Sequence, residues 1–324
     1  MLHTRAWMRH GFKILLLAAA GSTFGCSEVR GRRLVKQGNE LYRQGNYTEA
    51  VARFKEAEEF VPELSQLWLN KGYTCRQMLT PGAKTPENEA AVRCALEAFE
   101  KLQKLQPADK RGPSLYVQTL FEADRFEALS SMYQARYAKD PRDQEAVNSL
   151  VQVYSKWPDH TQQALEWYAK KADLNSGDAE AQYAPAVFIW QLLSMKGGGN
   201  DKTEFDPRVD PNARKRAKKT PPVFLPTDIV GKERSDLADK AIGYLEKAVA
   251  IRPKYGEAMT YLNLVYRQKA VAYFDKPDEW QKCVDKALEW RDKSLSMMGK
   301  PIPKPDAGVA PDEDSKSHAT KKGE

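Results

Sequence analysis

Residues 31–64 carry small, aromatic and aliphatic side chains at a spacing that fits two helices joined by a short turn. Leu34, Gly38 and Leu41 lie three and four residues apart, which places them on one face of the first helix. Gly45 supplies the turn, and Pro62 ends the second helix because a proline cannot continue it. The second helix presents an equivalent face. Its residues are Ala50, Phe54 and Ala57, with Tyr47 at the start of the helix. This segment therefore predicts a helix pair that packs on neighbouring pairs.

The pattern resembles the tetratricopeptide repeat (TPR), a helix-turn-helix unit of 34 residues. Gln37 and Leu41 depart from it, since the family usually has Leu and Tyr at these two positions. The resemblance implies an all-α fold, a right-handed α-solenoid of about six TPR-like helix-turn-helix pairs. It also implies that the first helices of successive pairs form a concave surface, which binds a protein or a peptide.

Three further pairs follow in the first half of the chain, at about 65–107, 110–141 and 144–175. The second pair keeps the signature residues Gly72, Ala95, Phe99 and Pro107. It also contains an insertion at residues 79–89, in which Pro81, Gly82 and Pro86 predict a surface loop.

The fifth pair is interrupted as well. Its first helix is expected from about Asp178 to Met195, and its second helix carries the signature residues Ala241, Ala248 and Pro253. The insertion between them, residues 197–234, is rich in glycine and proline, and a loop of that length is usually functional or disordered. A sixth pair carries Ala258 and Leu262 on one helix and Cys283 and Ala287 on the next. The solenoid is thus expected over residues 26–298, and residues 299–324 are predicted to be a disordered tail.

Residues 1–25 have the features of a secretory signal peptide. Three basic residues, at positions 5, 9 and 13, precede a short apolar run, which is too short to cross a bilayer. The exit, Thr23–Cys26, is similar to a bacterial lipobox, although Thr23 and Phe24 depart from that pattern. The similarity implies a lipidated Cys26 and, because Ser27 follows it, a place on the periplasmic face of the outer membrane. Ordinary cleavage, giving a soluble periplasmic or secreted protein, and a cytosolic protein are the alternatives.

Cys75, Cys94 and Cys283 remain after the leader. Cys75 and Cys94 flank the first insertion, and in an oxidising compartment a disulfide could join the two ends of that insertion. The alternative is that all three are small buried apolar side chains, as cysteine often is in helix packing. The second interpretation is the expectation here.

The sequence contains few of the residues and motifs on which enzyme active sites depend. His160 and His318 are the only histidines beyond the leader, and neither has a second His or Cys at metal-ligand spacing. Nucleophile elbows, phosphate loops and HExxH motifs do not occur. We therefore expect no enzymatic activity, no metal and no cofactor. The net charge of +7 falls to about +4 without the leader, which does not indicate a nucleic-acid partner.

Two groups of residues are candidates for binding a partner. The first lies in the long insertion, where Arg214, Lys215 and Arg216 belong to a dense basic run. These cations could contact an anionic surface such as lipid headgroups, although a solvated disordered loop is the favoured interpretation.

The second group lies on the expected concave surface. Some members of the TPR family bind chaperone carboxyl termini through Asn, Lys and Arg, and Asn39, Asn70 and Arg111 resemble three of those positions. Val35 and Leu115 stand where that carboxylate clamp needs cations, so we do not expect a clamp. Four aromatic residues could line the groove or pack in the core, and packing is expected for most of them. They are Tyr42, Trp68, Tyr73 and Trp190.

The sequence as a whole predicts a non-catalytic scaffold anchored in the bacterial cell envelope, which would assist assembly of an outer-membrane, secretion or pilus complex. One alternative is an adaptor that recruits a polysaccharide or peptidoglycan enzyme through residues 197–234. Another is a soluble cytosolic adaptor. The sequence does not indicate the oligomeric state.

Overall fold

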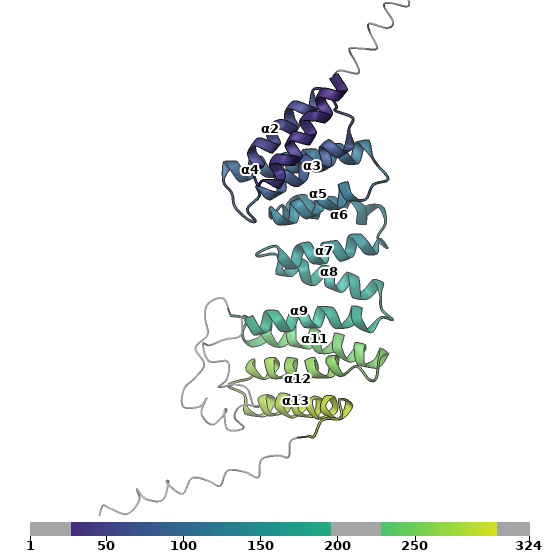
Figure 1. Cartoon of the computed structure of the whole chain (residues 1–324). Coiled ribbons are helices and arrows are strands. Elements are labelled where there is room, and N and C mark those ends of the chain that lie inside the picture. Colours follow the sequence, from purple (N-terminus) through teal and green to yellow (C-terminus); the bar gives the residue numbers. More distant parts are fainter. Residues whose placement is uncertain (1–26, 196–227, 303–324) are drawn as a thin grey trace, which may run out of the picture. The chain divides into compact units, whose positions relative to one another are not determined.

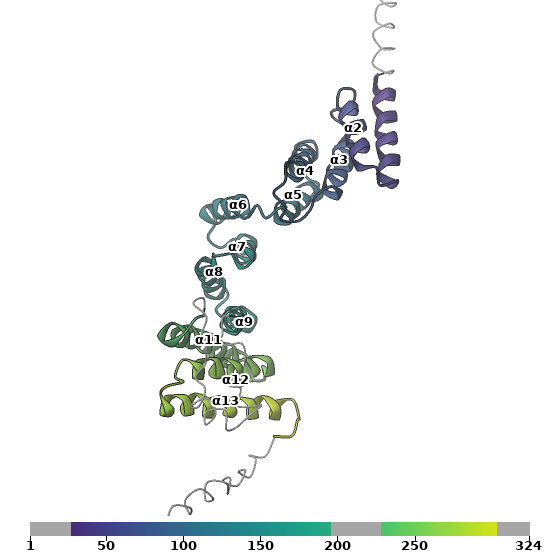
Figure 2. The same ribbon diagram turned by 90° about the vertical axis from the view of Figure 1, so that its left-hand side faces the viewer.

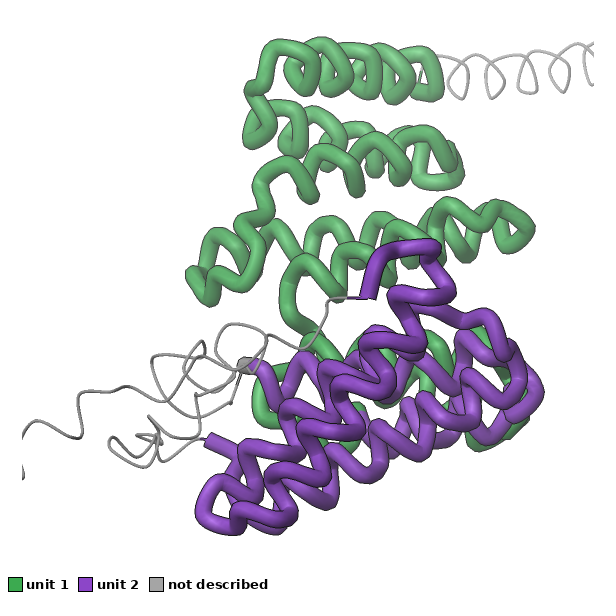
Figure 3. Tube along the Cα trace, turned by 90° about the horizontal axis from the view of Figure 1, so that it is seen from below, with its two compact units in different colours: residues 1–164 green, residues 165–324 purple. Residues whose placement is uncertain are grey.

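The computed structural model describes residues 27–195 and 228–302, and within these ranges every regular element is a helix. The chain divides into two compact units, residues 1–164 and residues 165–324 (Figure 3). Several predictions fall outside the described residues: the signal peptide, Cys26, the basic residues Arg214, Lys215 and Arg216, and most of the tail.

The first unit is a succession of helices in which, from α2 to α7, each contacts the next along the chain (Figure 1). Residues 27–43 form the amino-terminal helix. It is followed by α2 (Tyr47–Glu58), α3 (Ser65–Gln77), α4 (Pro86–Leu105), α5 (Arg111–Glu122), α6 (Phe126–Lys139) and α7 (Gln144–Lys156). Helix α8 (Thr161–Leu174) begins in this unit and continues in the second. The predicted pairs therefore occur with boundaries within a few residues of those expected from the sequence.

The signature residues make the contacts that hold the first two pairs together. A β-carbon added to Gly38 would lie 2.6 Å from the ring of Phe54, and one added to Gly72 would lie 2.4 Å from the ring of Phe99. Both rings are fully buried, together with Ala50 and further aliphatic side chains. A glycine in the first helix of each pair thus lets the aromatic ring of the second helix approach the backbone.

A residue in the left-handed region closes the bend within each of several pairs. Gly45 (φ 80°), Asp124 (φ 53°) and Asp159 (φ 61°) occupy such positions. In the first and third pairs, the amide after this residue donates to a carbonyl five residues earlier, from Asn46 to Leu41 and from Arg125 to Leu120. This arrangement is a Schellman motif, which satisfies carbonyls at the end of the first helix and reverses the chain.

The first insertion is a short loop braced by the helix that follows it. The loop covers residues 78–85, and α4 begins at Pro86, so the last part of the predicted insertion is helical. The buried side chain of Asn88 accepts from the amide of Thr80 (2.7 Å) and donates to the carbonyl of Ala83 (2.6 Å). The amide of Gly82 also donates to the carbonyl of Glu122 in α5. The loop is therefore at the surface, as predicted, and is held at several points.

The second unit contains the rest of α8, then α9 (Ala179–Met195), α11 (Gly231–Ile251), α12 (Gly256–Val271) and α13 (Pro277–Met297). Helix α11 packs on α9 and α12, α12 also contacts α9, and α13 packs on α12 (Figure 2). The predicted signature lies in the core, where Ala241, Leu245 and Ala248 are completely buried. Pro253 follows the end of α11, and Gly299 (φ 66°) closes the end of α13.

The carboxyl boundary of the second insertion differs from the prediction. Helix α11 begins at Gly231, whereas the insertion was expected to extend to residue 234. The reason is Arg234, which is completely buried in the first turn of the helix. Its guanidinium donates to the carbonyls of Leu193 (3.0 Å), Ile229 (2.9 Å) and Gln268 (2.9 Å), and to the side chain of Gln268. This one side chain therefore connects the segments before and after the insertion to each other and to α12.

The predicted fold class is confirmed for the described residues, which are all-α and arranged as successive helix pairs. None of the helices in these ranges combines the length and hydrophobicity that a bilayer-spanning segment requires.

Candidate functional site

A cavity of about 290 Å³ opens between the amino-terminal helix and α3 in the first unit. These are the first helices of the first two pairs, which are expected from the sequence to form the concave surface. Six residues line the cavity, namely Asn39, Tyr42, Arg43, Asn70, Tyr73 and Thr74. The two asparagines are the candidates that the sequence indicated. They come from different pairs and meet in one place.

The two asparagines are linked by hydrogen bonds. The amide nitrogen of Asn70 donates to the side-chain oxygen of Asn39 (2.7 Å), and Gln66 donates to the side-chain oxygen of Asn70 (2.6 Å). The hydroxyl of Thr74 donates to the backbone carbonyl of Asn70 (2.7 Å). The side-chain nitrogen of Asn39 keeps both of its donors for a ligand. The site therefore offers preoriented amide groups, which suit the donors and acceptors of a peptide backbone.

Tyrosine rings border the asparagines. Tyr73 is 37% exposed and lies edge-on to Phe99, with ring centroids 6.2 Å apart. Tyr42 lies 5.6 Å from the ring of Tyr47. Both tyrosines thus pack on one side and face the cavity on the other, as amphipathic aromatic side chains do at interfaces. Tyr42 and Tyr73 thus both line the cavity and pack against neighbouring rings, whereas packing alone was expected from the sequence for most of the aromatic candidates.

The charge at the mouth of the cavity is balanced. Arg43 forms an ion pair with Glu40 on the preceding turn. Hydrogen bonds from Arg43 and Gln44 lower the pKa of Glu40, and so hold it as a carboxylate. The site does not present the group of free cations that a carboxylate clamp or a phosphate backbone would need.

The remaining positions compared with the carboxylate clamp lie outside the cavity lining. Val35 and Leu115 are buried in the core, at 6% and 7% exposure. Arg111, at the start of α5, donates to Asp109 through two nitrogens, which lowers the pKa of Asp109. Arg111 is not among the residues that line the cavity. Of the three groove candidates from the sequence, the structure thus brings Asn39 and Asn70 together and leaves Arg111 apart.

The other aromatic candidates are structural. Trp68 is 9% exposed, and its indole nitrogen donates to the carbonyl of Pro62 (2.7 Å), which fixes the bend between the first and second pairs. Trp190 packs edge-on against Tyr261 in the second unit, at 5.2 Å between ring centroids.

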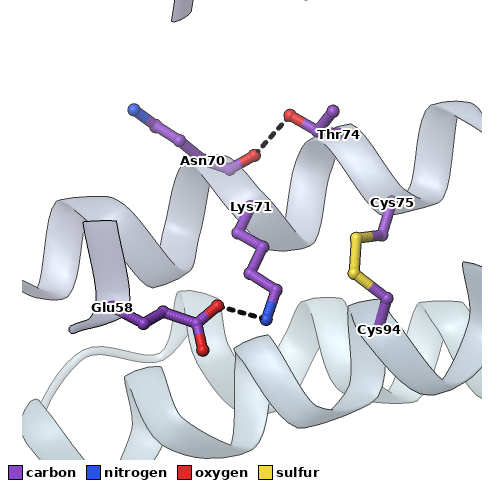
Figure 4. The surroundings of a disulfide bond; sticks show 6 residues. All are labelled: Glu58, Asn70, Lys71, Thr74, Cys75 and Cys94. Atoms are coloured by element: carbon purple, nitrogen blue, oxygen red, sulfur yellow. Dashed lines mark hydrogen bonds and ion pairs between the residues drawn. A yellow bond between two sulfur atoms is a disulfide. The ribbon is translucent and has the colours of Figure 1, made fainter. Parts of the chain in front are cut away.

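Cys75 and Cys94 form a disulfide between α3 and α4 (Figure 4), so the expectation of unpaired buried cysteines was wrong for this pair. Their Cα atoms are 5.9 Å apart because the two helices pack directly on each other. Cys283 is buried and unpaired, as expected. Figure 4 also shows that Asn70 and Thr74 lie on the side of α3 that faces away from the disulfide. The disulfide therefore fixes α3 on the side opposite the residues that line the cavity.

A buried ion pair supports the same helix. Lys71 is 7% exposed, and its ammonium lies 2.5 Å from Glu58 of α2 and 5.1 Å from the ring centroid of Trp68. Asn70 and Tyr73 are thus carried on a helix, α3, that is fixed by burial, by an ion pair and by a covalent bond.

A second cavity, of about 480 Å³, lies at the bend between α5 and α6. Phe126 and Trp157 contribute the aromatic part of its lining. The ring of His160 stacks on Trp157 at 3.8 Å, and its Nδ1 lies 2.7 Å from the carbonyl of Pro158. His160 is therefore engaged in the turn. Among the described residues, no group of His, Cys, Asp or Glu side chains is arranged to hold a metal ion.

Comparison with known proteins gives no relative by sequence. No protein-family model matches the chain, and no curated protein does either. Among solved structures, the chain is similar to the MamA protein, with 16% identity, 85% of this chain and 98% of that chain covered, and a TM-score of 0.24. It is also similar to YrrB, described as a TPR protein with an unusual peptide-binding site, with 15% identity, coverage of 70% and 88%, and a TM-score of 0.31.

A monomeric mutant of IFIT1 with Gppp-AAAA is a third similar structure, with 16% identity, coverage of 92% and 59%, and a TM-score of 0.31. These identities and scores are too low to transfer a ligand from any of the three. The case for the site therefore depends on its own geometry.

Proposed function

We propose that this protein is a non-catalytic scaffold that binds an extended segment of a partner protein in the cavity between the amino-terminal helix and α3. The observation that carries the proposal is the bond between Asn39 and Asn70, which joins two pairs and leaves amide donors directed at the cavity. Extended peptides present an amide and a carbonyl at every residue, and a row of side-chain amides can pair with both. Tyr42 and Tyr73 then supply apolar contact on either side.

A nucleic-acid ligand does not suit this site. Single-stranded nucleic acid requires a positively charged groove along its backbone. Arg43 is the cation in the lining, and it is already paired with Glu40. The prediction of a protein or peptide partner, with no nucleic acid, therefore stands as part of the proposal.

We place the scaffold in the bacterial cell envelope, held by a lipid on Cys26 at the periplasmic face of the outer membrane. The leader-like sequence and its lipobox support this location. The Cys75–Cys94 disulfide supports it independently, because such bonds persist in the periplasm and are rare in the cytosol. The same bond weighs against the soluble cytosolic adaptor. A role in assembling an outer-membrane, secretion or pilus complex follows by analogy with lipoproteins of this architecture.

The binding site is tested by a pull-down from detergent-solubilised envelope, quantified by mass spectrometry. The full chain is compared with Asn39→Ala/Asn70→Ala and with a matched control, Asn148→Ala/Gln152→Ala, which removes two exposed amides from α7. Each lost hydrogen bond costs about 1 kcal/mol, so the groove variant should bind its partner about 30-fold more weakly. Equal recovery with all three proteins would remove the groove from the proposal.

The identity of the recovered proteins separates the scaffold from its alternative. Assembly or secretion subunits support the scaffold, whereas glycan synthases favour an adaptor for a polysaccharide or peptidoglycan enzyme. The location is tested separately by mass spectrometry of the mature amino terminus. A diacylated Cys26 is the expected product, and an intact Met1 would contradict the envelope location.

A further inference from the structure

The amino-terminal helix is the most basic helix of the described chain. Within residues 27–43 it has five Arg and Lys residues against Glu28 and Glu40, which gives a net charge of +3. Helix α3 is next at +2, with Lys71 and Arg76 and no acidic residue, and both of those cations are in ion pairs. The charge of the amino-terminal helix is therefore a local feature of this end of the first unit.

The basic residues gather on the solvent side of the helix. Arg33 and Lys36 follow Val29 at intervals of four and three residues, and all three are exposed. Leu34, Val35 and Gly38 are buried on the opposite side. The outward position of this face is clearest at Val29, an apolar side chain that is 68% exposed.

Three of the cations are outside the ion pairs of this helix. Arg32 is paired with Glu28 and Arg43 with Glu40, whereas Arg30, Arg33 and Lys36 form no ion pair within the residues that the structure describes, and Lys36 acts on Glu40 only at longer range. The guanidinium of Arg30 lies 4.5 Å from the ring centroid of Phe60, which holds it in place without neutralising it. We call Arg30, Arg33 and Lys36 the amino-terminal basic patch. Asn39, Tyr42 and Arg43 of the same helix line the cavity, and none of them belongs to the patch, although Asn39 and Arg43 lie three and seven residues after Lys36 and so are close to it on the helix surface.

We infer that the amino-terminal basic patch binds the headgroups of anionic phospholipids. Charge complementarity supports this occupant, as does position: Lys36 lies ten residues after Cys26, which is about 15 Å along a helix. The inference rests on the proposed envelope location, because a lipid on Cys26 would hold the patch close to the headgroups. Exposed cations near an anionic surface attract it across a distance comparable to the Debye length.

The experiment measures partition of the mature chain, with Cys26→Ser so that it carries no lipid, onto vesicles by sedimentation. One set of vesicles contains phosphatidylcholine with about 30% phosphatidylglycerol, a mixture with the negative surface potential that attracts cations, and the other contains phosphatidylcholine alone. The variant Arg30→Gln/Arg33→Gln/Lys36→Gln is compared with a control of equal charge change, Lys55→Gln/Lys139→Gln/Lys282→Gln. The control residues are exposed and lie on α2, α6 and α13. Circular dichroism verifies that both variants fold.

The wild-type chain should partition onto the anionic vesicles at low salt, and the patch variant should lose about 100-fold in partition coefficient. The partition coefficient of the control variant should fall by less than a fifth of that factor. Raising the salt concentration should release the wild-type protein from the vesicles. Equal losses in the two variants would show a response to net charge alone and overturn the inference. Absence of binding would overturn it too, as would loss of a protein partner by the patch variant without any vesicle binding. Because Cys26 is replaced, these results do not depend on whether the natural protein is lipidated.

Discussion

Two insertions interrupt the repeats, and the two units brace them by different chemistry. Both lie between the first and second helix of a pair, one between α3 and α4 and the other between α9 and α11. In the first unit a covalent bond from Cys75 to Cys94 joins the flanking helices, and Asn88 braces the loop. In the second unit Arg234 connects the flanking segments through hydrogen bonds to the carbonyls of Leu193 and Ile229.

This difference indicates that a helix pair interrupted by an insertion requires another interaction to hold its two helices together in place of the short bend. An unbroken pair has a bend of a few residues closed by backbone hydrogen bonds, as at Gly45. Without that bend, the two helices are joined by a longer chain segment whose closure costs entropy. The first unit recovers the lost constraint with a bond that depends on redox conditions. The second recovers it with a buried charge, which depends on complete satisfaction of its donors.

The largest effect is expected from Arg234→Ala. The substitution leaves three buried carbonyls without their charged donor and opens a cavity, so the free energy of unfolding should fall by about 4 kcal/mol. Hydrogen exchange on the full chain measures the loss and locates it in α9, α11 and α12. Arg234→Lys should recover less than half of the lost free energy of unfolding. The single ammonium of lysine cannot donate to all of the carbonyls that the planar guanidinium of arginine reaches.

Arg252→Ala is the matched control for Arg234. Arg252 directly follows the last residue of α11. Unlike Arg234, its side chain is 47% exposed, and it forms an ion pair with Glu180. Its removal should cost less than about 1 kcal/mol. If Arg234→Ala is equally mild, the idea that this side chain braces the insertion is wrong.

Reduction of the disulfide should have the next largest effect. The bond closes a separation of 19 residues, and loss of a loop of this size costs about 3 kcal/mol in the chain-entropy account. Urea unfolding with and without dithiothreitol measures it. Cys75→Ala/Cys94→Ala should unfold as the reduced protein does and should no longer respond to the reductant, whereas Cys283→Ser should retain the response. A response that persists in the double variant would contradict this assignment.

Asn88→Ala should cost about 2 kcal/mol, because it removes one hydrogen bond to the amide of Thr80 and one to the carbonyl of Ala83. Combined with Cys75→Ala/Cys94→Ala, it tests whether the two braces of the first insertion act together. Losses that simply add in urea unfolding would indicate independent braces, and a smaller combined loss would indicate that one requires the other. Asn148→Ala, on the surface of α7, serves as the control.

The smallest effect concerns alkaline pH in the second unit. Burial raises the pKa of Tyr266 to about 12, above the value of about 10 for an unfolded tyrosine. The neutral phenol is thus favoured in the folded state, and its contribution is complete below pH 10 and is lost as pH rises through 12. After allowance for partial exposure, it is worth roughly 1 kcal/mol. Tyrosinate absorbance should show a transition near pH 12 that is lost in Tyr266→Phe, whereas the later titration of Tyr183 and Tyr255, whose pKa values burial also raises, should remain. An unchanged transition near pH 12 in Tyr266→Phe would contradict it.

Most of the helix pairs could be predicted from sequence because their contacts are local. Gly38 and Phe54 lie sixteen residues apart, within one pair, and the spacing of apolar residues in each helix fixes which faces meet. The start of α11 could not be found this way. Residues 231–240 lack the TPR pattern, and Arg234 reads as a solvated cation until the carbonyls of Leu193 and Gln268 are known.

The candidate site was predicted in part. Asn39 and Asn70 were identified from positions in the repeat, but their direct bond depends on how the first two pairs stack, which spacing does not give. Thr74 and Arg43 were missed, although each lies four residues after one of the asparagines and so shares its helix face. The disulfide was judged wrongly for the same reason, because only the packing of α3 on α4 brings the two thiols into range.

The bends closed by a left-handed residue limit where this chain can change length over evolution. The bond from Asn46 to Leu41, like that from Arg125 to Leu120, spans a fixed number of residues, so one added residue would break it. Residues 78–85 contain no such bond, and hydrogen bonds to Asn88 and to the carbonyl of Glu122 hold them instead. New loop sequence could therefore be acquired at the middle of a pair while every later helix keeps its register, and the binding surface of the other pairs would be inherited unchanged.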